Sequence, residues 1–314
     1  MMLLSIIIPT LNRGDAVIEN IHLLERYIVD NDLLDDVEII VSDNDSDKEE
    51  KQKVKKFVSS VKCKSKFYFQ NKNIGFENNL LFMLEKCNGK FAMTLGDDDY
   101  LDIELFRTII SYLRTDEYKT IICNFYLIDE NSNTISQPRD PIVEDVIITQ
   151  NDFRFSSKAH QMSCLVFSTI GLMDAYRINC KSTLYPQVYF VGYSLSLGKG
   201  VHITRFPYKC TSIEKKNFDY HFDNLFGEIC VAYDCLPFVS LSNKRYTIKY
   251  FLKSEYDRFI NRNTFFHPIR FIIMVLTKYR ISTLFKSMII RFFIIESIKL
   301  PFIFLYQNCL RKES

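Results

Sequence analysis

The stretch Lys90-Phe91-Ala92-Met93-Thr94-Leu95-Gly96-Asp97-Asp98-Asp99 joins an apolar run to three consecutive carboxylates. An apolar run that stops abruptly at charged residues is typical of a buried strand that leaves its sheet, with the acids in the loop at its carboxyl end. Open α/β sheets bind their ligands at that edge. Three adjacent acids repel one another, and a divalent cation with the phosphates that it carries would neutralise them. The stretch therefore predicts a metal and phosphate site, with a solvated acidic turn as the alternative.

The segments around this stretch alternate between strand and helix. Strands are predicted at 3–8, 37–41, 66–69, 91–95 and 120–127, and helices at 15–30, 48–56, through 80–84 and at 102–113. Such alternation predicts an α/β fold, with a mostly parallel sheet covered by helices on both faces. The strand ends would place the following residues along one rim: Thr10, Asn12, Asp43, Asn73, Gly75 and Asp97 to Asp99. Beyond residue 128 the pattern is less regular, with a loop at 129–140, a strand at 161–170 and a helix at 185–197.

Composition and chain length indicate a globular protein. The chain has 314 residues, enough for one large domain with an appendage. Its nine cysteines are odd in number and contain no C-x-x-C pair, which is typical of reduced cysteines in a cytosolic protein. The first residues carry no basic region, and Pro9 ends their apolar run early, so no secretory signal is predicted.

Charge is distributed unevenly along the chain. Residues 240–314 contain 14 Lys and Arg residues and 4 Asp and Glu residues, a net charge of +10. Because the whole chain carries +2, residues 1–239 carry −8. We therefore predict two domains, 1–239 and 240–314, that meet different partners.

Several common nucleotide and metal motifs are absent. The pattern Asp43-x-Asp45-x-Asp47 fails as a calcium loop, because Lys48 stands where glycine is needed and Val54 where a glutamate is needed. Asp43 is instead placed to accept hydrogen bonds from a nucleobase or ribose, while Asp47 could simply cap the helix that follows. No G-x-G-x-x-G or G-x-x-x-x-G-K-[ST] motif occurs. Phosphates would therefore be held through a metal at the three acids. None of the five histidines forms a metal-spaced pair.

Four motifs together resemble the family 2 glycosyltransferases. They are Ser5-Ile6-Ile7-Ile8-Pro9-Thr10-Leu11-Asn12-Arg13, Val41-Ser42-Asp43-Asn44-x-Ser46, Asn73-Ile74-Gly75-x-x-x-Asn79 and Gly96-Asp97-Asp98-Asp99. They are most similar to the abequosyltransferase-like branch of bacterial enzymes that build O-antigen or capsule. The resemblance implies a GT-A fold, a nucleotide-sugar donor, Mg²⁺ or Mn²⁺ as cofactor, and inversion at the anomeric carbon.

The resemblance also implies roles for single residues. Asp43 matches the acid that binds the base, and Asp97 to Asp99 match the DXD segment that binds metal and diphosphate. The donor-binding residues would be Pro9, Thr10, Asn12, Asp43, Asn73, Gly75 and Asp97, and the metal ligands Asp98 and Asp99. Residues 1–128 would form the nucleotide-sugar half of the domain, and 129–239 the acceptor half.

The chain departs from the family pattern at the general base. Many relatives carry an acid at the start of the acceptor-side helix, whereas Tyr185-Pro186-Gln187 occupies that place here. Glutamine cannot take a proton, so the base is not identified. The chain also lacks tryptophan and so cannot contain the Gln-x-x-Arg-Trp motif of processive synthases. Addition of single sugars is therefore expected.

The basic C-terminal region is rich in Phe, Ile and Leu. Charged residues interrupt it at Arg270, Lys278, Arg280, Lys286, Arg291, Glu296 and Lys299. Its longest uncharged run there, 300–310, has 11 residues, while a membrane span needs roughly 20. Helices that lie on an anionic membrane surface fit this composition. Packing on the catalytic core or an oligomer contact is the alternative, and nucleic acid binding is not expected because the basic residues alternate with aliphatic ones.

These observations predict an enzyme that transfers one hexosyl or deoxyhexosyl unit from a nucleotide-sugar to a lipid-linked saccharide. Its expected location is the cytoplasmic side of the cell membrane, as a peripheral protein. A degenerate fold of the same kind that binds nucleotide or membrane without catalysis is the alternative, which the glutamine at position 187 keeps open. A nucleotidyltransferase would need a basic, glycine-rich loop after the first strand, where only Arg13 and Gly14 occur. The sugar, the nucleotide, the acceptor and the oligomeric state stay open.

Overall fold

The structure is a computed structural model that describes residues 2–180, 182–212, 222–260, 272–273, 275–277 and 281–295. The chain divides into two compact units, Met1–Asp219 and Tyr220–Ser314. The sequence predicts a division between 239 and 240. Helix α7 (Phe222–Asp234) accordingly lies in the second unit instead of the first.

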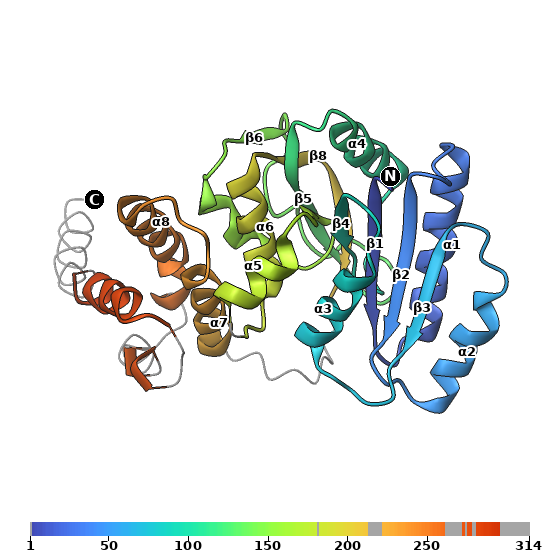
Figure 1. Cartoon of the computed structure of the whole chain (residues 1–314), viewed down its shortest axis with the longest axis horizontal. Coiled ribbons are helices and arrows are strands. Elements are labelled where there is room, and N and C mark those ends of the chain that lie inside the picture. The colour runs from blue at the N-terminus through green and yellow to red at the C-terminus, as the bar shows by residue number, and fades with distance from the viewer. Residues whose placement is uncertain are drawn as a thin grey trace, which may run out of the picture. The chain divides into compact units, whose positions relative to one another are not determined.

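An eight-stranded sheet forms the centre of the first unit, in the order β3-β2-β1-β4-β7-β5-β8-β6 (Figure 1). Its strands are β1 (Leu4–Thr10), β2 (Val37–Asp43), β3 (Ser65–Phe69), β4 (Phe91–Thr94), β5 (Tyr118–Ile128), β6 (Val146–Ile148), β7 (Leu165–Ser168) and β8 (Lys199–Thr211). Its helices are α1 (Gly14–Asp30), α2 (Lys48–Val58), α3 (Phe76–Lys86), α4 (Ile103–Arg114), the 3₁₀ helix η1 (Phe153–His160), α5 (Leu172–Asn179) and α6 (Pro186–Leu197).

The prediction of a mostly parallel α/β sheet is confirmed. Strand β1 pairs in parallel with β2 and β4, β2 with β3, and β5 with β8. Strand β7, within the predicted strand at 161–170, is antiparallel to both β4 and β5 and separates them. Because β7 runs opposite to β4, it begins beside the carboxyl end of β4, where Leu165 pairs with Thr94. The segment before β7 therefore reaches the same edge as the acids that follow β4.

Both faces of the sheet are buried. On one face Ile6 and Ile8 pack in a core cluster with Ile21 of α1 and Ile109 of α4. Ile7, which points the other way, is fully buried as well, and α3 contacts β1 and β2 on that face. Figure 1 shows α1 and α2 on one side of the sheet and α3, α5 and α6 on the other. A continuous apolar strand such as β1 fits burial on both faces.

The second unit contains α7, α8 (Leu241–Ile260) and a helix at 283–295. The carboxylate of Asp234, at the end of α7, accepts hydrogen bonds from Lys244 Nζ at 2.6 Å and from the backbone N–H of Ser282 at 2.6 Å. Tyr233 stacks on Phe251, with ring centroids 4.6 Å apart. These contacts join the three helices within the unit.

Part of the predicted basic tail lies outside the described residues, namely Arg270, Lys278, Arg280, Glu296, Lys299 and the run 300–310. Lys286 and Arg291 lie on the helix at 283–295. In the portions of the chain that the structure describes, we find no helix with the length and apolarity that crossing a bilayer requires.

Candidate functional site

The carboxyl ends of β1, β2 and β4 form the rim that the sequence predicts. Thr10, the last residue of β1, pairs with Asp43, the last residue of β2. The backbone N–H of Leu95 donates to the carbonyl of Ile7 at 3.0 Å, which carries the acidic segment 97–99 alongside β1. The side chains at the rim are largely removed from solvent, since Thr10, Asp43 and the three acids are all buried.

Asn12 joins the loops that follow β1 and β2. Its backbone has a positive φ of 56°, a conformation in which asparagine is more frequent than most residues. Its N–H donates to Ser46 Oγ at 2.7 Å, and its side-chain oxygen accepts from the N–H of Asp47 at 2.8 Å. Asp47 also caps α2 by accepting from the N–H of Glu50 at 3.1 Å, as the capping alternative predicts. Asn12 therefore shapes the rim through its contacts with the second loop.

Asp43 presents a buried carboxylate oxygen that has no hydrogen-bond donor among the described residues. Its Oδ1 accepts from the N–H of Ser46 at 2.7 Å, whereas its Oδ2 has no partner. Only 1% of the residue is exposed. A buried acceptor without a donor is costly, by about 1–3 kcal/mol and more for a charged group. The arrangement at Asp43 therefore fits a ligand that brings an N–H or O–H group.

The loop before α3 borders Asp43 and is held by asparagine side chains. Asn73 Oδ1 accepts hydrogen bonds from Asn44 Nδ2 at 3.0 Å and from the N–H of Gly75 at 2.9 Å. Asn44 Oδ1 accepts from the N–H of Ile74 at 3.0 Å. Gly75 has a φ of 81°, which favours glycine, and it precedes the first turn of α3. The predicted pair Asn73 and Gly75 thus fixes how this loop turns into α3.

Arg13 links the first two acids of the triplet. Its Nη1 lies 2.9 Å from Asp97 Oδ1 and 2.7 Å from Asp98 Oδ2. Burial raises the pKa of Asp97 to about 6, with Arg13 opposing the rise and Asp98 adding to it. A single cationic group thus lies between two of the three carboxylates and balances part of their charge.

The third acid, Asp99, is held from two later strands. Its Oδ2 accepts from Ser163 Oγ, just before β7, and its Oδ1 accepts from the N–H of Thr211 at 2.8 Å, at the end of β8. Ser163 Oγ also accepts from the N–H of Gly96 at 2.8 Å, and Asn20 Nδ2 donates to the carbonyl of Asp99 at 2.8 Å. These contacts fix the orientation of the Asp99 carboxylate at the rim.

The donor set of the rim fits a divalent cation that arrives with a diphosphate. Carboxylate oxygens are the ligands that Mg²⁺ and Mn²⁺ prefer. Among the described residues no group of three or more His, Cys, Asp and Glu side chains is arranged to hold a metal ion. Mg²⁺ in phosphate-binding enzymes is commonly held by one or two carboxylates and completed by phosphate oxygens. The acids here match that partial set.

Comparison with known proteins agrees with this geometry. Residues 5–179, more than half of the chain, match the family described as Glycosyl transferase family 2. The chain belongs to glycosyl transferase family 2. No curated protein sequence matches it.

Solved structures related to this family 2 glycosyltransferase show the same fold at low sequence identity. The crystal structure of S. aureus TarS 1–349 in complex with UDP-GlcNAc has a TM-score of 0.63 and 16% identity, with 87% of this chain and 80% of that chain covered. TarS 1–349 in complex with UDP has a TM-score of 0.60 and 17% identity, covering 86% and 80%. Mannosyltransferase PcManGT from Pyrobaculum calidifontis, in complex with GDP-Man and Mn²⁺, has a TM-score of 0.53 and 13% identity, covering 94% and 86%. The predicted GT-A fold is confirmed.

Gln187 lies beyond the family match, in the first turn of α6. Only 2% of the residue is exposed. Its Nε2 donates to the carbonyl of His160 at 3.3 Å, and its Oε1 has no partner among the described residues. The side chain thus ties α6 to the end of η1. The general base of this family 2 glycosyltransferase stays unassigned.

Sequence reasoning missed four residues that hold the acidic segment. They are Arg13, Asn20, Ser163 and Thr211. Arg13 was within reach of prediction, because it follows the first strand end directly and carries the charge that three acids attract. Ser163 and Thr211 contact Asp99 across 64 and 112 residues, and nothing local in the sequence marks such contacts.

Proposed function

We propose that this family 2 glycosyltransferase transfers a single sugar from a nucleotide-sugar to a lipid-linked saccharide, with metal dependence and inversion at the anomeric carbon. The observation that carries the proposal is the unpartnered, buried Oδ2 of Asp43, on the same rim as the acids that follow β4. The oxygen would accept a hydrogen bond from the base or ribose of the donor. Complexes of similar folds with UDP-GlcNAc, UDP and GDP-Man support a nucleotide-sugar as donor class.

Asp98 and Asp99 are the proposed metal ligands, and Asp97 is proposed to contact the donor. Bound Mg²⁺ or Mn²⁺ would neutralise the negative charge that develops on the departing diphosphate. Ser163 and Thr211 keep the Asp99 carboxylate oriented before the donor arrives. Asn12, Asn73 and Gly75 hold the surrounding loops, so the binding surface is formed in advance.

The acceptor side of the proposal rests on the sequence motifs and on the charge of residues 240–314. The four motifs resemble enzymes that build bacterial O-antigen or capsule, which act on lipid-linked saccharides. Residues 240–314 carry a net charge of +10, which suits contact with an anionic membrane surface. We therefore place the protein at the inner face of the cell membrane as a peripheral enzyme.

A nucleotide- or membrane-binding protein without catalysis is the second candidate. It is favoured by Gln187, which stands where relatives carry an acid and is buried with its amide bonded to His160. A nucleotide-binding protein of this kind differs from the transferase only in turnover, whereas a membrane-binding one would also lack affinity for a nucleotide-sugar.

The test is thermal unfolding of the full chain with a panel of nucleotide-sugars, with and without Mn²⁺, followed by a hydrolysis and transfer assay with the best donor. We expect one donor to stabilise the wild type only when Mn²⁺ is present, and Asp98→Asn to lose that stabilisation while keeping its fold. Asp36→Asn, which removes an exposed carboxylate paired with Arg114, is the matched control. Absence of any stabilising nucleotide-sugar would contradict the transferase and leave only a membrane-binding protein. Stabilisation without turnover on any lipid-linked saccharide would favour the second candidate.

A further inference from the structure

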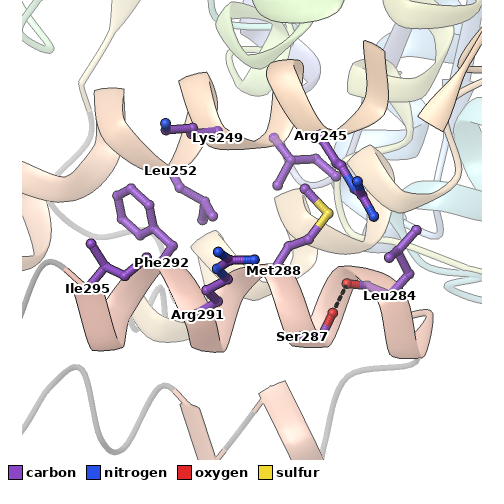
Figure 2. A pocket seen from close by; sticks show the side chains of 10 residues that line it. Arg245, Lys249, Leu252, Leu284, Ser287, Met288, Arg291, Phe292 and Ile295 are labelled. Carbon is purple, nitrogen blue, oxygen red and sulfur yellow. Dashed lines mark hydrogen bonds between the residues drawn. The ribbon is translucent and has the colours of Figure 1, made fainter. Parts of the chain in front are cut away.

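A cavity of about 410 Å³ lies between α8 and the helix at 283–295 in the second unit. Figure 2 shows side chains of both helices directed into it, among them Arg245 from α8 and Arg291 and Met288 from the facing helix. The volume falls within the range of small-molecule sites, roughly 300–1,000 Å³. Most of the lining side chains are either cationic or apolar, and each kind would contact a different part of one ligand.

The cationic part consists of Arg245, Lys249 and Arg291. All three are exposed, and none forms an ion pair with a described residue. No Asp or Glu is among the residues that line the cavity. Neighbouring Lys244 contrasts with them, because its Nζ lies 2.6 Å from Asp234. Three cations around one cavity whose lining holds no acid favour an anionic ligand.

The aliphatic part lies deeper between the helices. Ile248 and Leu252 of α8 are buried, and Met288 on the facing helix is partly buried. Ile295, at the end of the same helix, is 41% exposed and extends the apolar lining toward solvent. An inorganic anion alone would leave this apolar surface unused. A ligand with a hydrocarbon chain would remove it from water, which favours binding.

We propose that this cavity binds one lipid phosphate, with the phosphate between Arg245, Lys249 and Arg291 and the adjoining hydrocarbon against Ile248, Leu252 and Met288. The inference rests on the proposed function, and it identifies the cavity as a binding site for the phosphate end of the lipid that carries the acceptor. Arginine forms paired hydrogen bonds to phosphate oxygens, and two of the three cations are arginines. The long basic side chains can reach a headgroup while their stems stay in apolar contact.

Nucleic acid fits the cavity less well. Proteins that bind single strands combine cations with aromatic platforms on which bases stack, whereas Phe292 is the one aromatic residue of this lining. A flat anionic bilayer would need the cations on a common surface and would gain nothing from a concave site. A single lipid that enters between the two helices would contact the cations with its phosphate and the apolar lining with its hydrocarbon chain.

The test measures binding of dodecyl phosphate to the full chain by calorimetry, below the micelle concentration of the probe and without any nucleotide. Inorganic phosphate supplies the head alone, and dodecyl maltoside supplies the tail alone. We expect dodecyl phosphate to bind at least tenfold more tightly than either. If inorganic phosphate bound as tightly as dodecyl phosphate, the cavity would be an anion site only. If dodecyl maltoside bound as tightly, it would be an apolar surface only. Either result overturns the proposal.

Variants locate the site. Arg291→Gln and Arg245→Gln are each expected to weaken dodecyl phosphate about tenfold or more, the factor that a charge-assisted hydrogen bond provides. Lys253→Gln removes the same charge from an exposed position of α8 outside the lining and should leave the affinity unchanged. Circular dichroism confirms that each variant is folded. Equal affinities of Arg291→Gln and Lys253→Gln would place the ligand elsewhere and refute the assignment.

The same measurements separate this inference from the proposed function. Dodecyl phosphate binding that depends on Arg291, in a protein that no nucleotide-sugar stabilises, would support the lipid phosphate site and reject the transferase. Stabilisation by a nucleotide-sugar together with no binding of dodecyl phosphate would reject the site and leave the transferase supported.

Discussion

Arg13 Nη1 lies 2.7 Å from Asp98 Oδ2, and the same nitrogen contacts Asp97 Oδ1 at 2.9 Å. The guanidinium therefore balances the acidic segment when no other cation is bound. A metal ion held by Asp98 would compete with Arg13 for that carboxylate, since both need its oxygens. Arg13 would then turn toward the diphosphate, whose charge it can also neutralise. This relationship predicts opposite effects of one substitution on protein stability and on metal affinity.

Arg13→Ala should lower the free energy of unfolding by about 1.5–3 kcal/mol, because it leaves two buried carboxylates without their cation. In the absence of nucleotide it should tighten Mn²⁺ binding, measured by electron paramagnetic resonance of free Mn²⁺. Arg107→Ala breaks an exposed ion pair with Glu104 and serves as the control, with an expected effect below about 1 kcal/mol. Weaker Mn²⁺ binding by the free Arg13→Ala protein would show that Arg13 does not compete with the metal.

Asp43→Asn tests the donor site. The substitution keeps the shape of the side chain but replaces one acceptor oxygen by an NH₂ group. The binding free energy of the nucleotide should therefore weaken by about 1.5–3 kcal/mol, which is a loss of at least about tenfold in affinity. Asp45→Asn is the matched control, because Asp45 is exposed in the same loop and asparagine tolerates its φ of 76°. Calorimetry with the nucleoside diphosphate that best stabilises the wild type gives both values. Equal affinities for the two variants would exclude Asp43 from the donor site.

Ser163→Ala tests whether Asp99 depends on its orienting contacts. The change removes one donor to Asp99 and leaves the buried N–H of Gly96 without an acceptor, so stability should fall by about 1–3 kcal/mol. Mn²⁺-dependent affinity for nucleoside diphosphate should fall as well, while affinity measured without metal stays the same. Ser60→Ala, which removes an exposed hydroxyl bonded to the carbonyl of Phe57, controls for loss of a hydroxyl. A loss of stability with unchanged Mn²⁺ dependence would mean that Ser163 supports the fold alone.

Strands β1 to β5 and β7 were predictable because their apolar runs are local. Strand β1 is buried on both faces and reads as a continuous run of Ile residues, and β4 ends at a sharp change from apolar to charged residues. Strand β8 was not predicted. It contains Pro207, which argues against a strand, and its pairing with β5 shifts in register between Ile203 and Tyr208, on either side of that proline.

The candidate site likewise has a part that the sequence predicts and a part that it does not. Thr10 and Asp43 are the last residues of their strands and the acids follow β4, so parallel pairing alone brings them to one rim. The contacts that orient Asp99 depend on the antiparallel insertion of β7 between β4 and β5 and on the length of β8. These are properties of tertiary pairing, and they have no signature in a short window of sequence.

The net charge of +10 in residues 240–314 predicts salt-sensitive membrane binding. The full chain should float with vesicles of phosphatidylcholine that contain phosphatidylglycerol, and less with phosphatidylcholine alone. Each basic residue near the surface contributes about 1 kcal/mol, and salt screens this attraction, so recovery should fall as the salt concentration rises. Equal recovery with both vesicle types would remove the electrostatic basis of membrane contact.

Gln187→Glu decides whether position 187 could supply the missing base. Gln187 is 2% exposed, and its Nε2 donates to the carbonyl of His160 at 3.3 Å. A glutamate there would lose that donor when ionised and face the carbonyl with a negative charge, so burial should raise its pKa above the ordinary value of about 4.3. An acid whose pKa is raised on folding is favoured in its protonated form. The variant should therefore lose stability as pH rises through the unfolded-state pKa toward neutrality.

We expect the free energy of unfolding of Gln187→Glu at pH 7 to be about 1–3 kcal/mol below that of the wild type. The difference should be smaller at pH 5, and sugar transfer should not become faster. Gln187→Met, which also removes the amide but adds no charge, separates loss of the hydrogen bond from the cost of the buried carboxylate, because its effect should not change with pH. A Gln187→Glu protein that is as stable as the wild type at both pH values and transfers sugar faster would show that the position opens onto the acceptor and can hold the base.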